Sequence, residues 1–349
     1  MNNLNPVSSE VIFEVKGCAG LITLNRPKAL NAVTLNIVEQ MSEQLKVWAT
    51  DAAISHVIIK AVEGRAFSAG GDIVQLYEWG QNQDPRFMTF YHLEYHLNTL
   101  IKNYPKPYIA LIDGIVMGGG VGVSFNGSHR IVGDNVMFAM PETGIGLFPD
   151  VGGTYFLPRC PGALGMYLGL TGARLKAGDV LYAGLATHYV PSSQFAELEA
   201  VLCQNLDIES VLQQFQQRDV QTTLADQTSL IDNVFSLASI DQIFEQLEKN
   251  GDDWSVKTLK ILKTKSPTSL LITFRQLTQG KSLTFEQAMA LEYRLVSRIA
   301  QATDFFEGTR AVVIDKDMSP KWQPAALKDI SKSQIDAYFA PLETELWDV

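Results

Sequence analysis

The sequence predicts an α/β fold in which helices cover the faces of a sheet, followed by a predominantly helical C-terminal region. Short apolar, β-branched runs alternate with helical patterns up to about residue 190, and this alternation is typical of strand–helix units packed in layers. After about Ser192 glycine becomes rare, and helical periodicity rich in Gln, Leu, Asp and Lys takes over. We therefore expect a core over residues 1–190 and a mainly helical region over residues 191–349 that packs on it.

A hairpin and a helix are expected first. Val11–Val15 and Leu21–Leu24 alternate around Gly17–Gly20 as the two strands of a hairpin do. Thr34 has the side chain of a good N-cap, and apolar residues then recur at helical spacing to about Trp48. These patterns predict a two-stranded ribbon followed by one amphipathic helix.

Further strands and helices are expected in alternation. Pro85 opens a long helical pattern from Phe87 to about Asn103, which the Pro105-Lys106-Pro107 break ends. A shorter helix is expected from Gly119 to about Asn126. Short apolar runs predict four strands: His56–Val62, Tyr108–Ile112, Arg130–Val132 and Met137–Ala139.

Composition limits the class of protein. The net charge of −10 argues against a nucleic-acid binder, which needs a basic face. The cysteines, Cys18, Cys160 and Cys203, are odd in number and far apart, which fits neither a disulfide framework nor a zinc site. No apolar run reaches the length of a membrane span, and Met1–Glu10 lacks the features of a signal or transit peptide. We expect a cytoplasmic protein, or a mitochondrial matrix protein if the chain is eukaryotic and a transit peptide has been removed.

Two carboxylates stand in a stretch that is unlike a solvated loop. Glu142 and Asp150 lie eight residues apart among glycines, prolines and apolar side chains, and no Lys or Arg occurs between Gly133 and Arg159. Carboxylates in apolar surroundings lose hydration and bind protons more tightly, as functional acids and bases do. Asp150 also precedes Val151-Gly152-Gly153, so the alternative is that it only caps the N-terminus of a helix.

Two glycine turns are candidates for binding an oxyanion through the backbone. Arg65–Ile73 combines a strand, a glycine turn and a helix start, and Met117–Gly120 follows the strand Tyr108–Ile112. Glycine lets a backbone N–H approach a ligand closely. Each turn could aim one N–H at the same oxygen, assisted by the positive end of the following helix. The alternative is that both are merely tight strand–helix turns.

Several familiar templates do not fit. Gly118–Gly122 does not satisfy the dinucleotide motif G-x-G-x-x-G, and the chain has no G-x-x-x-x-G-K-[ST] phosphate loop. Gly122–Asn126 lacks the last glycine of a nucleophile elbow, so Ser124 is expected to be structural. His92 and His96 could share a helix face but do not form H-E-x-x-H, and we expect no metal site.

Four motifs together resemble the crotonase (enoyl-CoA hydratase/isomerase) superfamily. They are Asn25–Ala32, Phe67–Ile73, Gly118-Gly119-Gly120 and Pro141-Glu142, and the match covers about residues 10–190. Within the superfamily the chain is most similar to a hydrolase branch with a long C-terminal region. Four stretches carry that likeness: Met117–Gly122, Phe138–Gly153, Tyr155–Arg159 and, far downstream, Asp304–Gly308 with Asp315–Trp322. The resemblance implies a crotonase-like spiral of ββα units, with residues 1–190 as the catalytic core.

The resemblance also implies roles for individual residues. The N–H groups of Gly71 and Gly119 would form an oxyanion hole. Glu142 and Asp150 would be catalytic, and Glu94 would line the acyl pocket. CoA is part of the substrate, and no separate cofactor is implied. Two segments would wrap its pantetheine and adenine through Lys28, Ala29, Leu30, Ala69, Gly70, Asp72 and Ile73.

One departure from the hydratase pattern favours hydrolysis. Hydratases of this superfamily resemble the chain at Glu142 but carry a second catalytic Glu at the position of Gly122, which has no proton-transfer group. Addition of water to a double bond would therefore lack one of its two carboxylates. Asp150 stands instead where those hydratases usually have a glycine. We expect hydrolysis of a short, branched β-hydroxyacyl-CoA thioester.

Three alternatives to hydrolysis remain open. They are a hydratase or isomerase on the same fold, a CoA-ester decarboxylase, and a non-catalytic acyl-CoA-binding protein. Carboxylates kept in an apolar setting argue against the last, because buried charge without a function is costly. The expected partner is the acyl-CoA substrate, with neither nucleic acid nor membrane, and a homo-oligomer is compatible with the sequence.

Overall fold

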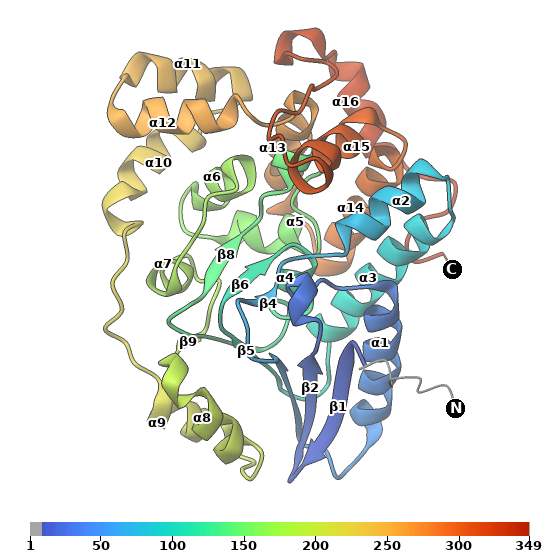
Figure 1. The fold of residues 1–349 in the computed structure, drawn as a ribbon. Helices are drawn as coiled ribbons and strands as arrows, with labels where there is room; N and C mark the ends of the chain where they lie inside the picture. The colour runs from blue at the N-terminus through green and yellow to red at the C-terminus, as the bar shows by residue number, and fades with distance from the viewer. Residues whose placement is uncertain (1–8, 349) are drawn as a thin grey trace.

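The computed structural model describes residues 9–348 and is drawn in Figure 1. The segment Met1–Glu10, which is expected to carry no targeting peptide, lies mostly outside these residues. Across residues 9–348 no helix is both long and apolar enough to cross a membrane.

A six-stranded sheet forms one layer of the molecule. Its strand order is β1-β2-β3-β5-β7-β9, and only β1 and β2 pair antiparallel. The predicted hairpin and the three predicted strands that belong to this sheet are confirmed. The strand bounds are β1 (Val11–Lys16), β2 (Ala19–Leu24), β3 (His56–Ala61), β5 (Tyr108–Ile112), β7 (His129–Val132) and β9 (His188–Tyr189).

A second, three-stranded parallel sheet lies beside the first. Its strands are β4 (Ala66–Ser68), β6 (Ile115–Met117) and β8 (Met137–Ala139), in that order. The chain passes from β3 to β4, from β5 to β6 and from β7 to β8, so each repeat places one strand in each sheet. Because the three strands of the small sheet are parallel, the segments that follow them meet at one edge.

Helices of the first half surround the two sheets (Figure 1). The predicted helix after Thr34 is confirmed, since the Thr34 hydroxyl accepts a hydrogen bond from the Ile37 N–H at 3.1 Å. The long helix after Pro85 is also confirmed as α3. The helix bounds are α1 (Leu35–Thr50), α2 (Ile73–Gln81), α3 (Arg86–Lys102), α4 (Gly119–Gly122), α5 (Gly153–Phe156), α6 (Leu164–Thr171) and α7 (Ala177–Tyr182).

Helix α4 is shorter than the prediction, which extended it to Asn126. It ends at Gly122 because the Ser124 N–H bonds to the Val121 carbonyl instead of the Gly120 carbonyl, and the Asn126 side-chain amide donates to the Gly122 carbonyl at 3.0 Å. That carbonyl would otherwise accept the next helical N–H. Ser124 is buried and its hydroxyl donates to the Gly120 carbonyl, so it is structural as expected.

The second half is helical, as the change of composition after Ser192 predicts. Helices α8 and α9 pack on the large sheet, where Leu198 and Leu212 join strand residues such as Ile58 in one apolar cluster. Helices α13 to α15 lie near α2, α3 and α5 (Figure 1). The bounds are α8 (Phe195–Leu202), α9 (Ile208–Phe215), α10 (Thr228–Phe235), α11 (Ile240–Asn250), α12 (Asp253–Leu262), α13 (Pro267–Gly280), α14 (Phe285–Ile299), α15 (Thr303–Thr309) and α16 (Lys332–Phe339).

The main hydrophobic core runs through both halves of the chain. A single cluster contains buried residues from Val11 near the start to Leu346 near the end. The division into a catalytic core over residues 1–190 and a helical region over residues 191–349 therefore stays a prediction, because the two parts share this core. What matters for the site is that helices from the second half close over elements of the first.

Candidate active site

The edge of the small sheet brings three predicted site residues together. Gly71 follows β4, Gly119 follows β6 and Glu142 follows β8, and the three strands are parallel neighbours. A Cβ built on Gly119 would lie only 3.1 Å from the Gly71 nitrogen. The two glycine turns, which are 48 positions apart in sequence, are therefore in contact.

The N–H groups of Gly71 and Gly119 are both unused within the part of the chain that the structure describes. Neighbouring backbone groups are paired: Val33 N–H donates to the Gly70 carbonyl, and Asp72 N–H donates to the Val33 carbonyl. Neither glycine N–H donates to another protein group. Because buried backbone donors are nearly always paired, two adjacent free ones suit a ligand oxygen.

One cavity joins the glycine turns to the carboxylates, and its empty space, counted together with the open solvent at its mouth, is about 480 Å³. Gly71, Gly119, Glu94, Glu142 and Asp150 all line it. The rest of its wall is mostly apolar, and the apolar side chains there are Ile73, Leu76, Phe90, Met117, Ile145 and Leu147. The five candidate residues thus share a single, largely apolar compartment.

Glu142 begins a 3₁₀ turn directly after Pro141. Its side chain is buried, and its Oε1 lies 3.3 Å from the position that a Cβ on Gly118 would take. Burial raises the pKa of Glu142 well above its ordinary value, and the nearby Asp150 raises it further. The Lys265 ammonium, contributed by the C-terminal region, acts in the opposite direction. The sequence around Glu142 contains no such cation, so this neighbour was not predicted.

Asp150 lines the same cavity and accepts a hydrogen bond from a tyrosine. The Tyr95 hydroxyl donates to its Oδ2 at 3.0 Å. Burial raises the pKa of Asp150 to about 7, and the Tyr95 hydrogen bond limits that rise by favouring the charged form.

The alternative that Asp150 caps a helix is wrong. Gly152 is the N-cap of α5, and the carboxylate of Asp150 takes no part in the cap. Glu292 of α14 accepts the N–H groups of Gly152 and Thr154 instead.

Glu94 is buried on α3 and faces the glycine turn that contains Gly119. Its Oε1 would lie 2.6 Å from a Cβ on Gly119 and has no hydrogen-bond partner among the described residues. Burial raises the pKa of Glu94 well above its ordinary value, and the charges of Asp150 and Glu292 add to the rise. Glu94 is therefore positioned in the wall of the cavity, as the resemblance implies.

Besides Lys265, sequence reasoning missed Tyr91, Tyr95 and Glu292. Tyr91 lines the cavity, and its buried hydroxyl has no hydrogen-bond partner among residues 9–348. Burial raises the pKa of Tyr91, and neighbouring carboxylates raise it further. The signal for the tyrosines was present, because Tyr91, Glu94 and Tyr95 recur at helical spacing on one face of α3. Glu292 carries no comparable signal, since it stands in an ordinary amphipathic pattern.

The position of Gly122 has no room for a side chain. A Cβ there would lie 2.8 Å from the Asn98 amide nitrogen and 2.9 Å from the Val151 Cβ. Real Cβ atoms do not approach other atoms so closely without displacement. A glutamate at this position would collide with Asn98 of α3 and with Val151, the residue after Asp150.

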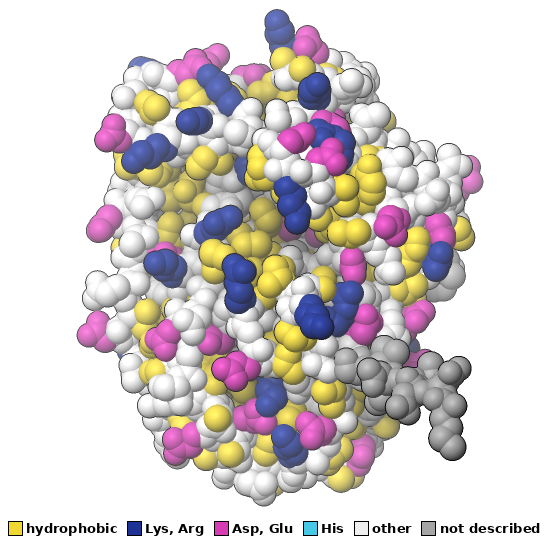
Figure 2. All heavy atoms as spheres, viewed as in Figure 1, with side chains coloured by type: hydrophobic (Ala, Val, Ile, Leu, Met, Phe, Trp, Pro, Cys, Tyr) yellow, Lys and Arg dark blue, Asp and Glu magenta, His cyan; other side chains and the backbone are white. Residues whose placement is uncertain are grey.

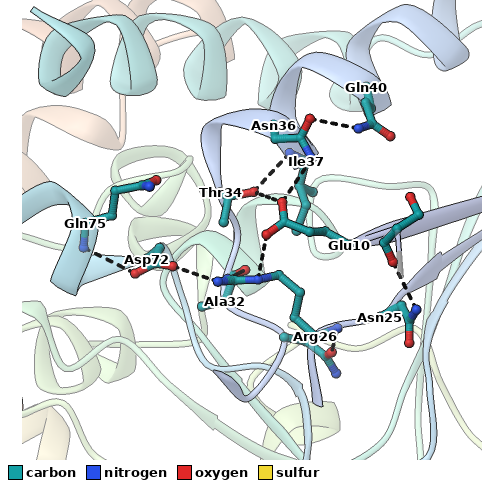
Figure 3. A network of polar contacts seen from close by, with 12 residues as sticks. Glu10, Asn25, Arg26, Ala32, Thr34, Asn36, Ile37, Gln40, Asp72 and Gln75 are labelled. Carbon is teal, nitrogen blue, oxygen red and sulfur yellow. Dashed lines mark hydrogen bonds and ion pairs between the residues drawn. The ribbon is translucent and has the colours of Figure 1, made fainter. Parts of the chain in front are cut away.

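The residues that the resemblance assigns to CoA also lie together. Arg26 pairs with Glu10 at 2.9 Å and with Asp72 at 3.0 Å, which ties the segment before Lys28 to the first glycine turn (Figure 3). The Ala69 N–H donates to the Leu30 carbonyl at 3.0 Å. Asp72 further accepts the Gln75 N–H at the start of α2. The two segments are therefore in contact, one carrying Lys28, Ala29 and Leu30 and the other Ala69, Gly70, Asp72 and Ile73.

The histidine pair on α3 lies apart from this cavity. The rings of His92 and His96 are 4.6 Å apart and pack against Tyr293 and Trp347. Within residues 9–348 no three His, Cys, Asp or Glu side chains are grouped to hold a metal ion.

Comparison with known proteins places the chain in a family. Residues 19–339 match the enoyl-CoA hydratase/isomerase family. The mitochondrial 3-hydroxyisobutyryl-CoA hydrolase of Xenopus tropicalis is 46% identical over 98% of this chain and 91% of its own length. The human protein of the same name is 45% identical over the same shares.

Solved structures agree on the fold. A carnitinyl-CoA dehydratase from Mycobacterium thermoresistibile matches with a TM-score of 0.93 and 36% identity, covering 97% of this chain and 99% of that one. An enoyl-CoA hydratase from Rhodobacter sphaeroides matches with a TM-score of 0.90 and 38% identity, covering 96% and 98%. The predicted crotonase-like α/β spiral with a helical C-terminal region is thereby confirmed. The chain belongs to the enoyl-CoA hydratase/isomerase family.

Proposed function

We propose that the protein is an acyl-CoA thioester hydrolase that converts 3-hydroxyisobutyryl-CoA to 3-hydroxyisobutyrate and CoA, a step of valine catabolism. One observation carries the proposal: Glu142 and Asp150 share a cavity with two N–H groups that have no partner among residues 9–348, while Gly122 leaves no room for the second glutamate of a hydratase. Curated relatives that are 42–46% identical over nearly the whole chain carry this hydrolase name.

The thioester carbonyl oxygen binds to the N–H groups of Gly71 and Gly119. These donors are fixed by the two parallel strands that precede them, so they need no rearrangement when negative charge develops on the oxygen. One such donor contributes roughly 3–4 kcal/mol to stabilising the transition state. Polarisation of the carbonyl by the backbone explains why we propose no metal or redox cofactor, with CoA present only as part of the substrate.

Glu142 starts the reaction by one of two routes. As general base it takes a proton from water, whose oxygen then bonds to the carbonyl carbon. As nucleophile it attacks that carbon itself, and water afterwards cleaves the resulting mixed anhydride. In both routes the carbon–sulfur bond breaks, the thiolate leaves and takes up a proton, and the water oxygen is retained in the products. The raised pKa of Glu142 makes its carboxylate a stronger base than an exposed one.

Asp150 orients water or the substrate hydroxyl and supplies a proton to the departing thiolate. Its pKa of about 7 lets it exchange protons near neutral pH. Glu94 and the free Tyr91 hydroxyl offer hydrogen bonds to the β-hydroxyl of the acyl group, while the apolar wall holds its methyl branch. Hydroxylated, branched acyl groups therefore suit the cavity.

The CoA moiety lies along the surface formed by Arg26–Leu30 and Ala69–Ile73. On the face shown in Figure 2, Lys and Arg side chains border a central patch of hydrophobic side chains although the chain is acidic overall. Such a surface suits a ligand that carries phosphates and an apolar arm. Self-assembly stays a prediction. The relatives are named as mitochondrial, so we propose the mitochondrial matrix for a eukaryotic source and the cytoplasm otherwise.

Hydration is the second candidate, because two similar solved structures are described as a dehydratase and a hydratase. The experiment is to measure thiol release from 3-hydroxyisobutyryl-CoA and loss of the enoyl absorbance of crotonyl-CoA with the same preparation. We expect rapid thiol release and little or no hydration. Hydration at a rate matching the best thioester hydrolysis would overturn the proposal. If the protein catalyses neither reaction, the result would favour a non-catalytic binding protein.

A further inference from the structure

The turn that carries Asp150 is held in an unfavourable backbone conformation. Within Pro149–Thr154, here called the Asp150 turn, Val151 has a φ of +51°. A β-branched residue rarely adopts this left-handed conformation, which costs of order 1–3 kcal/mol and persists only where surrounding structure enforces it. The strained residue is the immediate neighbour of Asp150.

Buried side chains from three elements hold this turn through its backbone. Gln276 of α13 donates to the Pro149 carbonyl at 2.7 Å, and Asn126 donates to the Val151 carbonyl at 3.1 Å. Glu292 of α14 accepts the Gly152 N–H at 3.0 Å and the Thr154 N–H at 2.9 Å, one with each carboxylate oxygen. Two of the three side chains thus come from the C-terminal helices.

Of these three side chains, Glu292 is the one whose burial costs the most free energy. It is fully buried, and no Lys or Arg pairs with it in the described part of the chain. Burying a carboxyl group is costly unless its oxygens are hydrogen-bonded. A Ser or Asn cap would satisfy one N–H at lower cost, whereas the two oxygens of the Glu292 carboxyl group accept two N–H groups on either side of Gly153 at once. This chemistry fits a need to fix the turn, beyond capping the short helix α5.

We propose that Glu292 is a positioning residue for the hydrolysis: it locks the Asp150 turn in its strained form and so fixes the carboxylate of Asp150 relative to Glu142. Glu292 contacts neither substrate nor reacting atoms and acts only through Asp150. The inference rests on the proposed function, because it assumes that Asp150 takes part in turnover. It also gives the C-terminal region a definite part in catalysis.

The main test is Glu292→Gln, measured by thiol release from 3-hydroxyisobutyryl-CoA. Gln keeps the size but places an NH₂ group opposite one of the two N–H donors. The turn therefore loses one of its two hydrogen bonds to residue 292. Misplacement of a reacting group by about 1 Å can cost on the order of 10²-fold, and we expect kcat to fall by roughly 10- to 100-fold with KM close to wild type. Asp179→Asn is the control for replacing a buried carboxyl group elsewhere. Asp179 does not line the cavity and accepts the Thr223 and Leu224 N–H groups, both with Oδ1, so its variant should keep kcat.

A double-mutant cycle separates positioning from general loss of stability. In an Asp150→Asn background, Glu292→Gln should cause no further loss of kcat, because its effect passes through Asp150. An equal fold-loss in both backgrounds, or an unchanged kcat in the single variant despite a lower melting temperature, would overturn the inference. If Asp150→Asn itself keeps wild-type turnover, the proposed role of Asp150 fails instead.

A second variant keeps the test available if Glu292→Gln does not fold. Gln276→Met removes the donor to the Pro149 carbonyl. It also removes a buried amide oxygen that has no hydrogen-bond partner in the described part of the chain, so its cost in stability is partly offset. It should lower kcat in the wild-type background and leave kcat unchanged in the Asp150→Asn background. Full activity of Gln276→Met would contradict the claim that the C-terminal helices hold the turn.

Discussion

Removal of one hydroxyl should move the pH dependence of turnover. Tyr95→Phe deletes the 3.0 Å hydrogen bond to Asp150 and leaves the ring in place. That bond favours the charged form of Asp150, so its loss raises the pKa of Asp150 above about 7. A hydrogen bond to a charged group contributes about 1.5–3 kcal/mol. At 1.36 kcal/mol per pKa unit, the shift is about one to two units upward.

The assay is a profile of kcat/KM for thiol release against pH. Glu142 and Asp150 interact, so the acid limb reports the first ionisation of the pair. We expect this limb to move upward in Tyr95→Phe. The control is Tyr104→Phe, which removes a 2.8 Å hydrogen bond to the Leu45 carbonyl near the end of the same helix. An acid limb that stays at its wild-type position in Tyr95→Phe, or that moves equally in the control, would refute the reasoning.

Three further predictions follow from the packing of the site. Gly119→Ala places a methyl group 2.6 Å from the Glu94 Oε1 and within the oxyanion hole, so thiol release should fall by about 10²- to 10³-fold; near-normal turnover would exclude an oxyanion at this glycine. Gly122→Ala overpacks the core and should lower the free energy of unfolding in urea by about 1–3 kcal/mol, whereas Gly64→Ala, whose Cβ would have no atom closer than 3.8 Å, should leave it unchanged. Burial raises the pKa of Glu292 from 4.5 to about 8, so its contribution to stability is greatest below pH 4.5 and is lost as the pH rises through about 8. The stability difference between wild type and Glu292→Gln should accordingly shrink between pH 5 and pH 8.5, and a difference that grows would contradict this pKa.

Local signals predicted the fold well because they act within a few residues. The Thr34 cap and the apolar stripe of α1 belong to one helix, and a hairpin needs only the pairing of adjacent strands. The prediction placed the end of α4 too late, because the Asn126 side chain competes with the backbone for the Gly122 carbonyl. Such competition depends on a single rotamer, which periodicity does not report.

The candidate site could be predicted only where its residues lie in recognisable motifs. The glycine turns and the two carboxylates are of this kind, and parallel strands bring their segments to one edge. Glu292 and Lys265 could not be predicted, because they approach from the C-terminal region, more than 100 positions away in the sequence. Their position depends on how the C-terminal helices pack on the core, and no local pattern encodes that packing.

The central claim is that Glu142 carries out thioester hydrolysis in this cavity. The most direct measurement is the rate of thiol release from 3-hydroxyisobutyryl-CoA by wild type and Glu142→Gln, with binding of the CoA ester measured on both. Gln preserves size but is neither a base nor a nucleophile, so we predict a fall in turnover of at least about 10²-fold with binding almost unchanged. A Glu142→Gln variant that turns over near the wild-type rate would contradict the account.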